Sequence, residues 1–441
     1  MGLPLEASRS GCALHGALYA ALAVKGVVPI IHSTSGCGIQ SCLGGTTCSG
    51  WSGTGLIGGS AIPSSNISEK QVVFGGTSRL REQIKNTVKV VSGDLYVVLS
   101  GCSTEMVGDD IPAMVREARE QGFPVINIAT PGFRGSVYRG YELFLKGIIS
   151  QLEPAVGSPV HPIPGLINIL GIVPTQDVFW EGNLDEIASL LARIDLRANS
   201  LFGYGTTVEG LHDLRRAQLS LVFSPWGLDA ARELEARFGI PWINLNFLPV
   251  GAEESARLFE TVAEALILNL ERINRVNDDL RKREGHFLNK LADAYYIQGW
   301  QLECAIVADS STAPGIATFL AKTLGLLPSL VIITDNPADQ NRLELAESVD
   351  KLLPGFGTRI LFCEDQGEIS DALLQRAPEI ILGSSLEQDV AHRLHIPLVE
   401  ISFPVTGQVE LNKCHAGLRG ALALLEDVGR AILLSQSGDI S

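Results

Sequence analysis

The sequence has few basic residues and no run of them. Among its 441 residues, 34 are Lys or Arg and 49 are Asp or Glu, which gives a net charge of −15 at pH 7. Proteins that bind nucleic acids through the phosphate backbone carry basic patches. We therefore predict no nucleic-acid partner. An acidic chain of this kind suits small molecules or a partner protein with a basic face.

The sequence also lacks a long hydrophobic run. The most apolar N-terminal stretch, residues 13–31, is interrupted by His15, Lys25 and Pro29, and it has neither the basic start nor the cleavage site of a signal peptide. We expect a cytoplasmic protein that has no membrane partner. Cysteines stay reduced in the cytoplasm, so the eight cysteines do not predict disulfides.

Nucleotide-binding patterns are missing where they would be expected. Residues 303–325 read as a strand, a turn and a helix but lack G-x-G-x-x-G, and no G-x-x-x-x-G-K-[ST] occurs in the chain. These patterns bind dinucleotides and nucleoside triphosphates through glycine-rich turns. The sequence itself therefore indicates no ATP or NAD site.

What the sequence contains is an alternation of short apolar runs with helical stretches. Such alternation is typical of βαβ units and parallel sheets, and continuously apolar strands fit sheets covered on both faces. The predicted strands are 27–33, 95–101, 124–132, 220–225, 241–249, 303–311, 329–335, 359–365, 379–385 and 397–404, and the predicted helices are 110–121, 228–238, 253–273, 274–298, 315–324, 340–352, 369–376 and 415–434.

The alternation falls into three blocks, which we predict to be three Rossmann-like domains of an α/β protein. A Pro-rich segment at 154–165 follows the first block, and the polar helix predicted at 274–298 connects the second to the third. The predicted domains are 1–152, 153–285 and 286–441.

Three cysteines are the candidate metal ligands. Cys37 and Cys102 each follow a predicted strand, where open α/β sheets bind ligands, and a glycine precedes both of them and Cys12. The absence of a CxxC pair argues against structural zinc. An iron–sulfur cluster usually needs four cysteines, so three would imply further ligands from a partner chain. The alternative is three buried, reduced thiols.

Several stretches resemble the nitrogenase component 1 family. In the first 150 residues they are GCALHGALYAALAVKGVVPIIHSTSGC (11–37), KQVVFGGTSRLREQI (70–84), GCSTEMVGDDI (101–111) and ATPGFRGSVYRGYELFLKGI (129–148). A later stretch, IPLVEISFPVTGQVELNKCHAGLRGALALL (396–425), resembles the C-terminal part of the β-type subunit.

The resemblance implies a cofactor and two partners. The family's catalytic component is an α2β2 assembly of chains with three Rossmann-like domains, and each chain gives three cysteines to a P-cluster, [8Fe-7S], at the αβ interface. By motif, Cys37 falls on the bridging position, and Cys12 and Cys102 on the terminal ones. The resemblance further implies an α-like catalytic partner that holds an iron–sulfur metallocofactor, and an ATP-dependent iron–sulfur reductase that docks transiently.

Two further details bear on the subunit type and the ligand set. Some β subunits add a serine ligand within TP-x-F-x-GS, and here Gly132 occupies that position. The central stretch 220–227, where an α-type chain would carry a cofactor cysteine, has none. Cys414 and His415 are neighbours, and adjacent residues seldom point into one site, so we do not expect them to bind metal. The chain is thus predicted to relay electrons, with no catalytic residue of its own.

The remaining cysteines have simpler interpretations. Cys42 and Cys48 lie in a Gly-, Ser- and Thr-rich segment, 41–66, which has no helical or strand period and is predicted to be a long loop. They are either extra ligands or ordinary loop thiols. Cys304 and Cys363 lie in apolar strand patterns and are expected in the core.

Polar residues near the three cysteines also have two interpretations. His15 and His32 either donate hydrogen bonds to cluster sulfur or simply pack. Glu105, Asp109 and Asp110 follow Cys102 and are expected to cap the next helix, because carboxylates favour helix N-termini.

The sequence departs from the nitrogenase pattern in three places. It begins almost at Cys12, it has HSTSGC in place of HG-x-x-GC, and it carries the Gly-rich segment after Cys37. Retention of all three cysteines argues against the cofactor-assembly scaffold and the tetrapyrrole reductases of the family. The resemblance therefore favours methylthio-alkane reductase, which cleaves C–S bonds and releases methanethiol for sulfur salvage. The alternatives are a divergent nitrogenase β subunit that reduces dinitrogen, and an assembly scaffold or cluster carrier.

Overall fold

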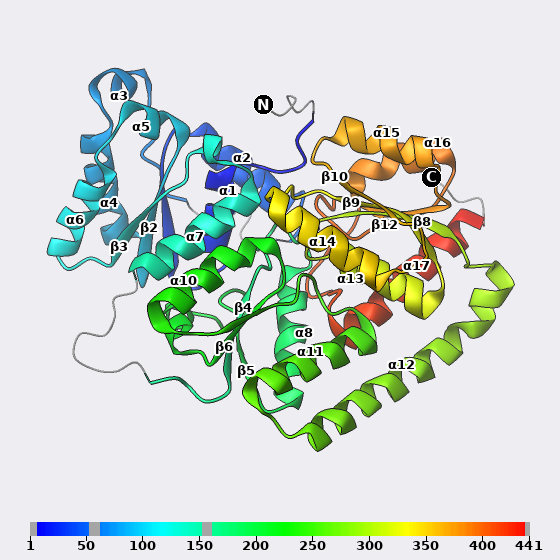
Figure 1. The fold of residues 1–441 in the computed structure, drawn as a ribbon. Coiled ribbons are helices and arrows are strands. Elements are labelled where there is room, and N and C mark those ends of the chain that lie inside the picture. The colour runs from blue at the N-terminus through cyan, green and yellow to red at the C-terminus, as the bar shows by residue number, and fades with distance from the viewer. Residues whose placement is uncertain (1–6, 53–61, 152–160, 437–441) are drawn as a thin grey trace.

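The structure is a computed structural model that describes residues 7–52, 62–151 and 161–436. Figure 1 shows three sheets that follow one another along the chain, with helices packed on them. The strand pairs of these sheets are parallel, which confirms the predicted α/β class. Within the described ranges, no helix combines the length and apolar character that a membrane span requires.

The first sheet has the strand order β1-β2-β3 and carries the candidate site. Its strands are apolar along their length because α1 and α7 pack on one face, while α4 and α6 pack on the other. The elements are β1 (Val27–His32), β2 (Leu95–Ser100), β3 (Val125–Ala129), α1 (Ala13–Leu22), α2 (Gly36–Thr46), α3 (Glu69–Phe74), α4 (Thr77–Val90), α5 (Cys102–Val107), α6 (Ile111–Glu120) and α7 (Val137–Gln151).

Helices α1 and α7 cross with their backbones almost in contact. A Cβ atom added at Gly16 would lie 1.8 Å from the carbonyl oxygen of Val137, and one added at Gly140 would lie 2.0 Å from that of Ala13. Only glycine fits at such distances, because backbone atoms cannot move aside as a flexible side chain can. The crossing fixes α1, and therefore the cysteine that precedes it, against α7.

Replacing Gly140 by Ala is expected to lower the free energy of unfolding by about 2 kcal/mol, since the added methyl group overlaps the backbone of α1. The measurement is the midpoint of urea unfolding. Gly285→Ala is the matched control. A Cβ there meets nothing within 4 Å, and alanine is the better helix former by roughly 1 kcal/mol. Equal midpoints for the two variants would contradict the tight crossing.

The second sheet has the order β5-β4-β6-β7 and shares one hydrophobic core with the first. Its central strand β4 was not among the predicted strands, because Asn168 interrupts the apolar run. That side chain is buried and donates a hydrogen bond to the carbonyl oxygen of Leu214 at 2.9 Å. The elements are β4 (Leu166–Leu170), β5 (Arg197–Asn199), β6 (Leu219–Val222), β7 (Trp242–Asn244), α8 (Trp180–Arg193), α9 (Val208–Asp213), α10 (Leu228–Phe238) and α11 (Gly251–Leu266).

The third sheet has the order β10-β9-β8-β11-β12 and two cores of its own, one on each face. Its five strands alternate with helices as the sequence pattern predicts. The elements are β8 (Glu303–Ala308), β9 (Leu327–Ile333), β10 (Arg359–Phe362), β11 (Ile380–Gly383), β12 (Leu398–Glu400), α13 (Ala313–Phe319), α14 (Asp339–Leu352), α15 (Gln366–Arg376), α16 (Gln388–Leu394) and α17 (Gly417–Gln436).

The long helix α12 (Leu270–Gln298) connects the second sheet to the third (Figure 1). The helix predicted at 253–273 is wrong at its end, because α11 stops at Leu266 and α12 begins four residues later. Ile267 adopts a left-handed conformation with φ of +55°, and the side chain of Asn269 accepts hydrogen bonds from the first amides of α12. A local cap therefore ends α11, although the apolar periodicity of the sequence continues beyond it.

Three buried aspartates face one another where the sheets adjoin. Asp177, Asp309 and Asp335 line one small enclosed space, together with Tyr138 of α7 and Trp226. The indole of Trp226 stacks on Tyr138 and donates a hydrogen bond to Asp335 Oδ2 at 2.7 Å. Burial, reinforced by the charge of Asp309, raises the pKa of both Asp177 and Asp335 to about 7. Asp177 and Asp335 therefore stay protonated at pH values well above those at which an exposed aspartate ionises.

Candidate metal centre

The three candidate cysteines all lie at the start of a helix. Cys12 is the N-cap of α1, Cys37 lies in the first turn of α2, and Cys102 is the first residue of α5. Strands β1 and β2 are parallel neighbours, and His32 is paired with Ser100. Cys37 and Cys102, which follow these strands, therefore lie at the same edge of the sheet. Helix N-termini favour negative charge, and this position suits thiolates.

Gly132 lies between two of the thiols. Its backbone N–H donates a hydrogen bond to Cys102 Sγ at 3.1 Å. A Cβ added at Gly132 would lie 3.1 Å from Cys12 Sγ and 3.2 Å from Cys102 Sγ. The isolated bridge between Cys12 and Ser136 brings the start of α1 to this turn. The structure therefore brings together two cysteines that are distant in sequence, around the position where some β-type chains carry serine.

His15 lies between the Cys12 thiol and the backbone of Cys37. The backbone N–H of Cys12 donates to His15 Nδ1 at 3.2 Å, and Cys12 Sγ lies 3.4 Å from the same atom. On the other side of the ring, Nε2 lies 3.3 Å from the carbonyl oxygen of Cys37. Burial lowers the pKa of His15, which favours the neutral ring. Of the two interpretations of His15, the structure supports a contact with a candidate ligand.

Ser33 was missed by the sequence analysis. Its hydroxyl lies 3.4 Å from Cys37 Sγ, and its side chain packs so closely on Gly101 that a Cβ there would lie 2.1 Å from Ser33 Oγ. The serine therefore contacts one thiol and the residue preceding another. Its position four residues before Cys37 was the available signal, but serine at such a spacing is common in turns.

The second histidine and the acidic residues have other partners. His32 Nε2 lies 3.0 Å from Asp109 Oδ2, and its Nδ1 lies 2.9 Å from the hydroxyl of Ser65. Asp109 also accepts the N–H of Gly76, at the start of α4, at 2.6 Å. Asp110 does cap α6 through the N–H of Ala113 at 3.0 Å, as predicted.

The capping prediction is wrong for the other two acids. The carboxylate of Asp109 bonds the start of α4 and His32 instead of the first turn of α6. Glu105 lies within α5 and accepts a hydrogen bond from the hydroxyl of Ser100. Both carboxylates therefore fasten the loops that carry Cys102, which is a structural role at the same edge.

The other cysteines lie apart from this group. Cys304 is buried in β8, where burial raises the pKa of its thiol to about 12. Cys363 is only half-buried beside the core and donates a hydrogen bond to Glu368 Oε2 at 3.3 Å. Cys48 is also half-buried. The side chain of Cys42 lies outside the described part of the chain.

Cys414 and His415 are both buried. The thiol of Cys414 donates to the carbonyl oxygen of Ala416 at 3.6 Å. The ring of His415 packs on that of Phe179 with centroids 4.2 Å apart, and burial lowers its pKa to about 3. The two neighbours thus have separate surroundings.

The prediction of one long loop over 41–66 is wrong at its start. Helix α2 continues through Thr46, and residues 53–61 lie outside the described part of the chain. Gly44 and Gly45 lie against the ring of Tyr19, where a Cβ would be 2.5 Å from the hydroxyl oxygen and 3.3 Å from the ring. Tertiary packing on α1 therefore holds a helical turn that propensity alone disfavours.

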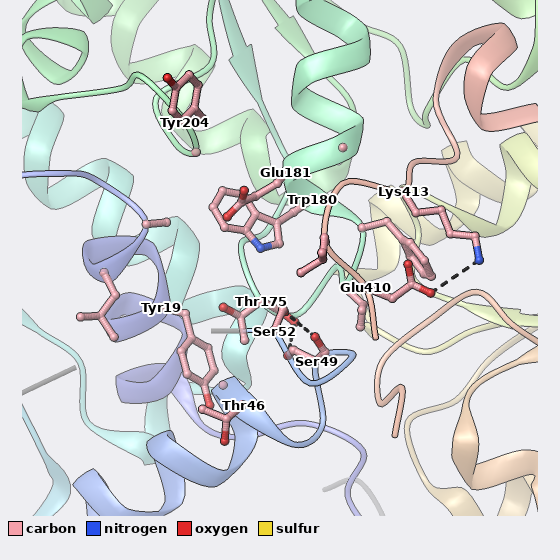
Figure 2. A pocket seen from close by; sticks show the side chains of 18 of the residues that line it. Tyr19, Thr46, Ser49, Ser52, Thr175, Trp180, Glu181, Tyr204, Glu410 and Lys413 are labelled. Atoms are coloured by element: carbon pink, nitrogen blue, oxygen red, sulfur yellow. Dashed lines mark hydrogen bonds and ion pairs between the residues drawn. The ribbon is translucent and has the colours of Figure 1, made fainter. Parts of the chain in front are cut away.

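A cavity of about 430 Å³ lies between α1, α2, α8 and the segment before α17 (Figure 2). Tyr19 lines it and stacks on His15, one helical turn away, at a centroid distance of 6.5 Å. Two of its hydroxyls already bond within the protein: Ser49 donates to the carbonyl of Thr175 and Ser52 to that of Ser49. These two hydroxyls are therefore already satisfied by carbonyl groups of the chain.

The donor set fits an iron–sulfur group that another chain completes. Thiolates suit iron–sulfur clusters, and Cys102 is exposed while Cys12 and Cys37 are half-buried. In residues 7–52, 62–151 and 161–436, no group of three or more His, Cys, Asp or Glu is arranged to hold a metal ion.

Comparison with known proteins identifies the family. The family model described as nitrogenase component 1 type oxidoreductase matches residues 12–433. The chain belongs to the nitrogenase component 1 family. The match begins at Cys12 and covers all three sheets.

The chain is β-chain-like within this family, at low identity. It is 25% identical to the nitrogenase molybdenum-iron protein beta chain of Methanothermobacter marburgensis, over 96% of this chain and 93% of that protein. It is also 25% identical to the nitrogenase vanadium-iron protein beta chain of Trichormus variabilis, over 96% and 92%. A chain of the solved structure "Nitrogenase Cp1 at pH 6.5" has the same fold, with a TM-score of 0.81 at 19% identity, covering 100% of this chain and 96% of that one.

Proposed function

We propose that this chain is the β-type subunit of a nitrogenase-like reductase and holds half of a P-cluster through Cys12, Cys37 and Cys102. The observation that carries the proposal is the arrangement of the cysteines: the thiols of Cys12 and Cys102 flank Gly132, and His15 lies between the Cys12 thiol and the backbone carbonyl of Cys37. Three thiols on one open face match the half-site that the family resemblance implies, with the remaining ligands supplied by an α-like subunit of an α2β2 assembly.

Exposed apolar side chains around the thiols support a partner at this face. Ile39, Met106 and Phe133 are 66%, 80% and 65% exposed, and each lies within four residues of Cys37, Cys102 or Gly132. Helix α3, which packs near α5, adds Val73 and Phe74. Large apolar side chains gathered on one face usually mark a protein interface. We therefore place the α-like subunit over the thiols.

The residues of this chain would hold and insulate the cluster. When bound, the cluster supplies one-electron transfer between the reductase and the metallocofactor of the partner. Cys12, Cys37 and Cys102 would supply thiolate ligands, and the N–H of Gly132 would donate to the Cys102 sulfur, as it does in the structure. Hydrogen bonds to sulfur and burial tune the reduction potential of such clusters. With glycine at position 132, the side-chain oxygen that some β-type chains offer is missing.

We further propose that the complex reduces C–S bonds of methylthio-alkanes and releases methanethiol and a hydrocarbon. The support is the departure from the nitrogenase pattern in HSTSGC, in the Gly-rich segment after Cys37 and at Gly132. An ATP-dependent iron–sulfur reductase would be the source of electrons.

The test is a headspace assay of the anaerobic complex, purified with its co-expressed α-like partner and supplied with the reductase, ATP and dithionite. Dinitrogen, acetylene, dimethyl sulfide and 2-(methylthio)ethanol are offered separately. We expect methanethiol with the matching hydrocarbon, and little ammonia. Ammonia as the main product would instead indicate a divergent nitrogenase. No turnover by a cluster-loaded complex would indicate an assembly scaffold or cluster carrier.

A further inference from the structure

The N-terminal arm, residues 7–12, connects the third sheet to the candidate metal centre. At its start, Ser8 forms an antiparallel bridge with Asp365, and the N–H of Gln366 donates to the carbonyl oxygen of Ala7 at 3.0 Å. At its end, Cys12 bridges to the segment before α7. The arm is thus attached at both ends, with a cluster ligand as its last residue.

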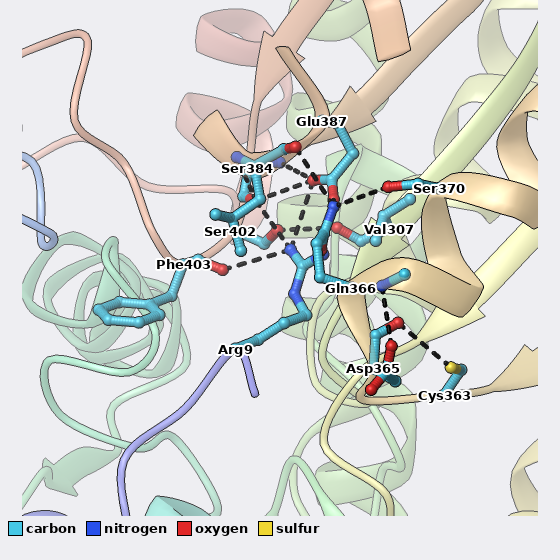
Figure 3. A network of polar contacts seen from close by, with 12 residues as sticks. Arg9, Val307, Cys363, Asp365, Gln366, Ser370, Ser384, Glu387, Ser402 and Phe403 are labelled. Atoms are coloured by element: carbon cyan, nitrogen blue, oxygen red, sulfur yellow. Dashed lines mark hydrogen bonds and ion pairs between the residues drawn. The ribbon is translucent and has the colours of Figure 1, made fainter. Parts of the chain in front are cut away.

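Arg9 is the buried anchor of the arm (Figure 3). Its guanidinium donates to Glu387 Oε1 at 2.6 Å, to Gln366 Oε1 at 2.7 Å and to the hydroxyl of Ser384 at 2.8 Å. The Arg9 and Glu387 side chains are 3% and 0% exposed. Glu387 is in turn held by the N–H of Ser384 at 2.7 Å. The planar guanidinium donates several hydrogen bonds in a fixed arrangement, and the buried carboxylate matches that arrangement. The pairing therefore holds the Arg9 side chain in one orientation.

This anchor acts over a short length of chain. Only two residues separate Arg9 from Cys12, so a displacement of the guanidinium passes directly to the start of α1. The buried partners also make displacement costly, because breaking the pair leaves an uncompensated charge in the interior. Partners in the shell behind a metal ligand set its position in this way.

We propose that Arg9 is a positioning residue that holds the Cys12 thiol at the centre by clamping the N-terminal arm to the third sheet. The inference rests on the proposed function only where it treats Cys12 as a cluster ligand. The clamp itself is a property of the chain without the cluster, so it has a readout of its own.

The test compares the full-length wild-type chain with Arg9→Gln. We expect faster hydrogen exchange across residues 7–12 and faster alkylation of Cys12, while the buried Cys304 and Cys414 stay as slow as in the wild type. In the co-expressed complex, the same variant should hold iron about 10-fold less tightly against a chelator. Arg393→Gln is the matched control, because it removes an exposed pair with Asp389 on α16.

Each outcome decides the matter. Selective exposure of Cys12 with weaker iron retention supports the clamp and the ligand. Selective exposure with unchanged iron retention supports the clamp and overturns the assignment of Cys12 as a ligand. Unchanged exchange in the arm, or an equal rise at Cys304 and Cys414, overturns the clamp. Should Arg9→Gln fail to accumulate, Glu387→Gln breaks the same ion pair with a side chain of the same size and gives the same comparison.

Discussion

The Cys37→Ala variant of the co-expressed complex is expected to lose most of its iron–sulfur signal and all of its electron relay. Cys37 is the thiol for which we propose the bridging role. In the described ranges, no other thiol lies in the first turn of α2, so none is placed to replace it. The measurements are iron content, electron paramagnetic resonance of the reduced and oxidised complex, and turnover. The fold should survive, because the side chain is only half-buried at a helix start.

The control for this variant is Cys363→Ala. Cys363 is also a half-buried thiol, but it follows β10 of the third sheet and is not one of the candidate ligands. Its replacement should leave iron content and turnover at the wild-type level. A Cys37→Ala complex that keeps a full cluster and full activity would show that the ligand assignment is wrong.

The Asp335→Asn variant is expected to be more stable than the wild type at pH 8, by roughly 4 kcal/mol. Burial, followed by the charge of Asp309, raises the pKa of Asp335 in the folded chain from 3.8 to about 7. Between these two values the folded state binds more protons than the unfolded state, so the contribution of Asp335 to the free energy of unfolding falls as the pH rises. An amide does not ionise, and its oxygen can still accept the hydrogen bond of Trp226.

The measurement is the free energy of unfolding by urea at several pH values from 4 to 8. The difference between variant and wild type should grow with pH across the interval and level off above about pH 7. Asp177 and Asp309 face the same space and titrate in both proteins, so they leave a residual slope. Asp339→Asn, at a side chain that is 96% exposed, is the control and should show no such difference. A variant less stable than the wild type at every pH would refute the argument.

The sequence was informative where apolar periodicity coincides with the fold. Strands β8, β9 and β11 of the third sheet and the strands that precede Cys37 and Cys102 consist mostly of buried apolar residues, and the structure has them where the pattern predicts. The sequence was uninformative where a buried polar group or a local cap determines the presence of a strand or the end of a helix. Asn168 interrupts the apolar pattern of β4, because its hydrogen bond forms only in the assembled sheet. Ile267 ends a helix, although the apolar periodicity continues past it.

At the candidate centre, too, the sequence indicated some of the residues and not others. The sequence singled out Cys12, Cys37 and Cys102, together with Gly132 and His15, through spacing and family resemblance. It could not predict Ser33 or Arg9, because their partners are distant along the chain or depend on a turn. Arg9 binds Glu387 across a separation of 378 residues, and no local pattern in RSGC indicates that contact.

That separation also orders events during synthesis. The arm that ends at Cys12 leaves the ribosome first, but its anchoring carboxylate is made 378 residues later. Chains emerge at about 5–20 residues per second, and domains generally fold as units from the N-terminus. The first sheet can therefore form while its first thiol is still unanchored. On the proposed assignment of Cys12 as a cluster ligand, this side of the site is anchored only after Glu387 has been made.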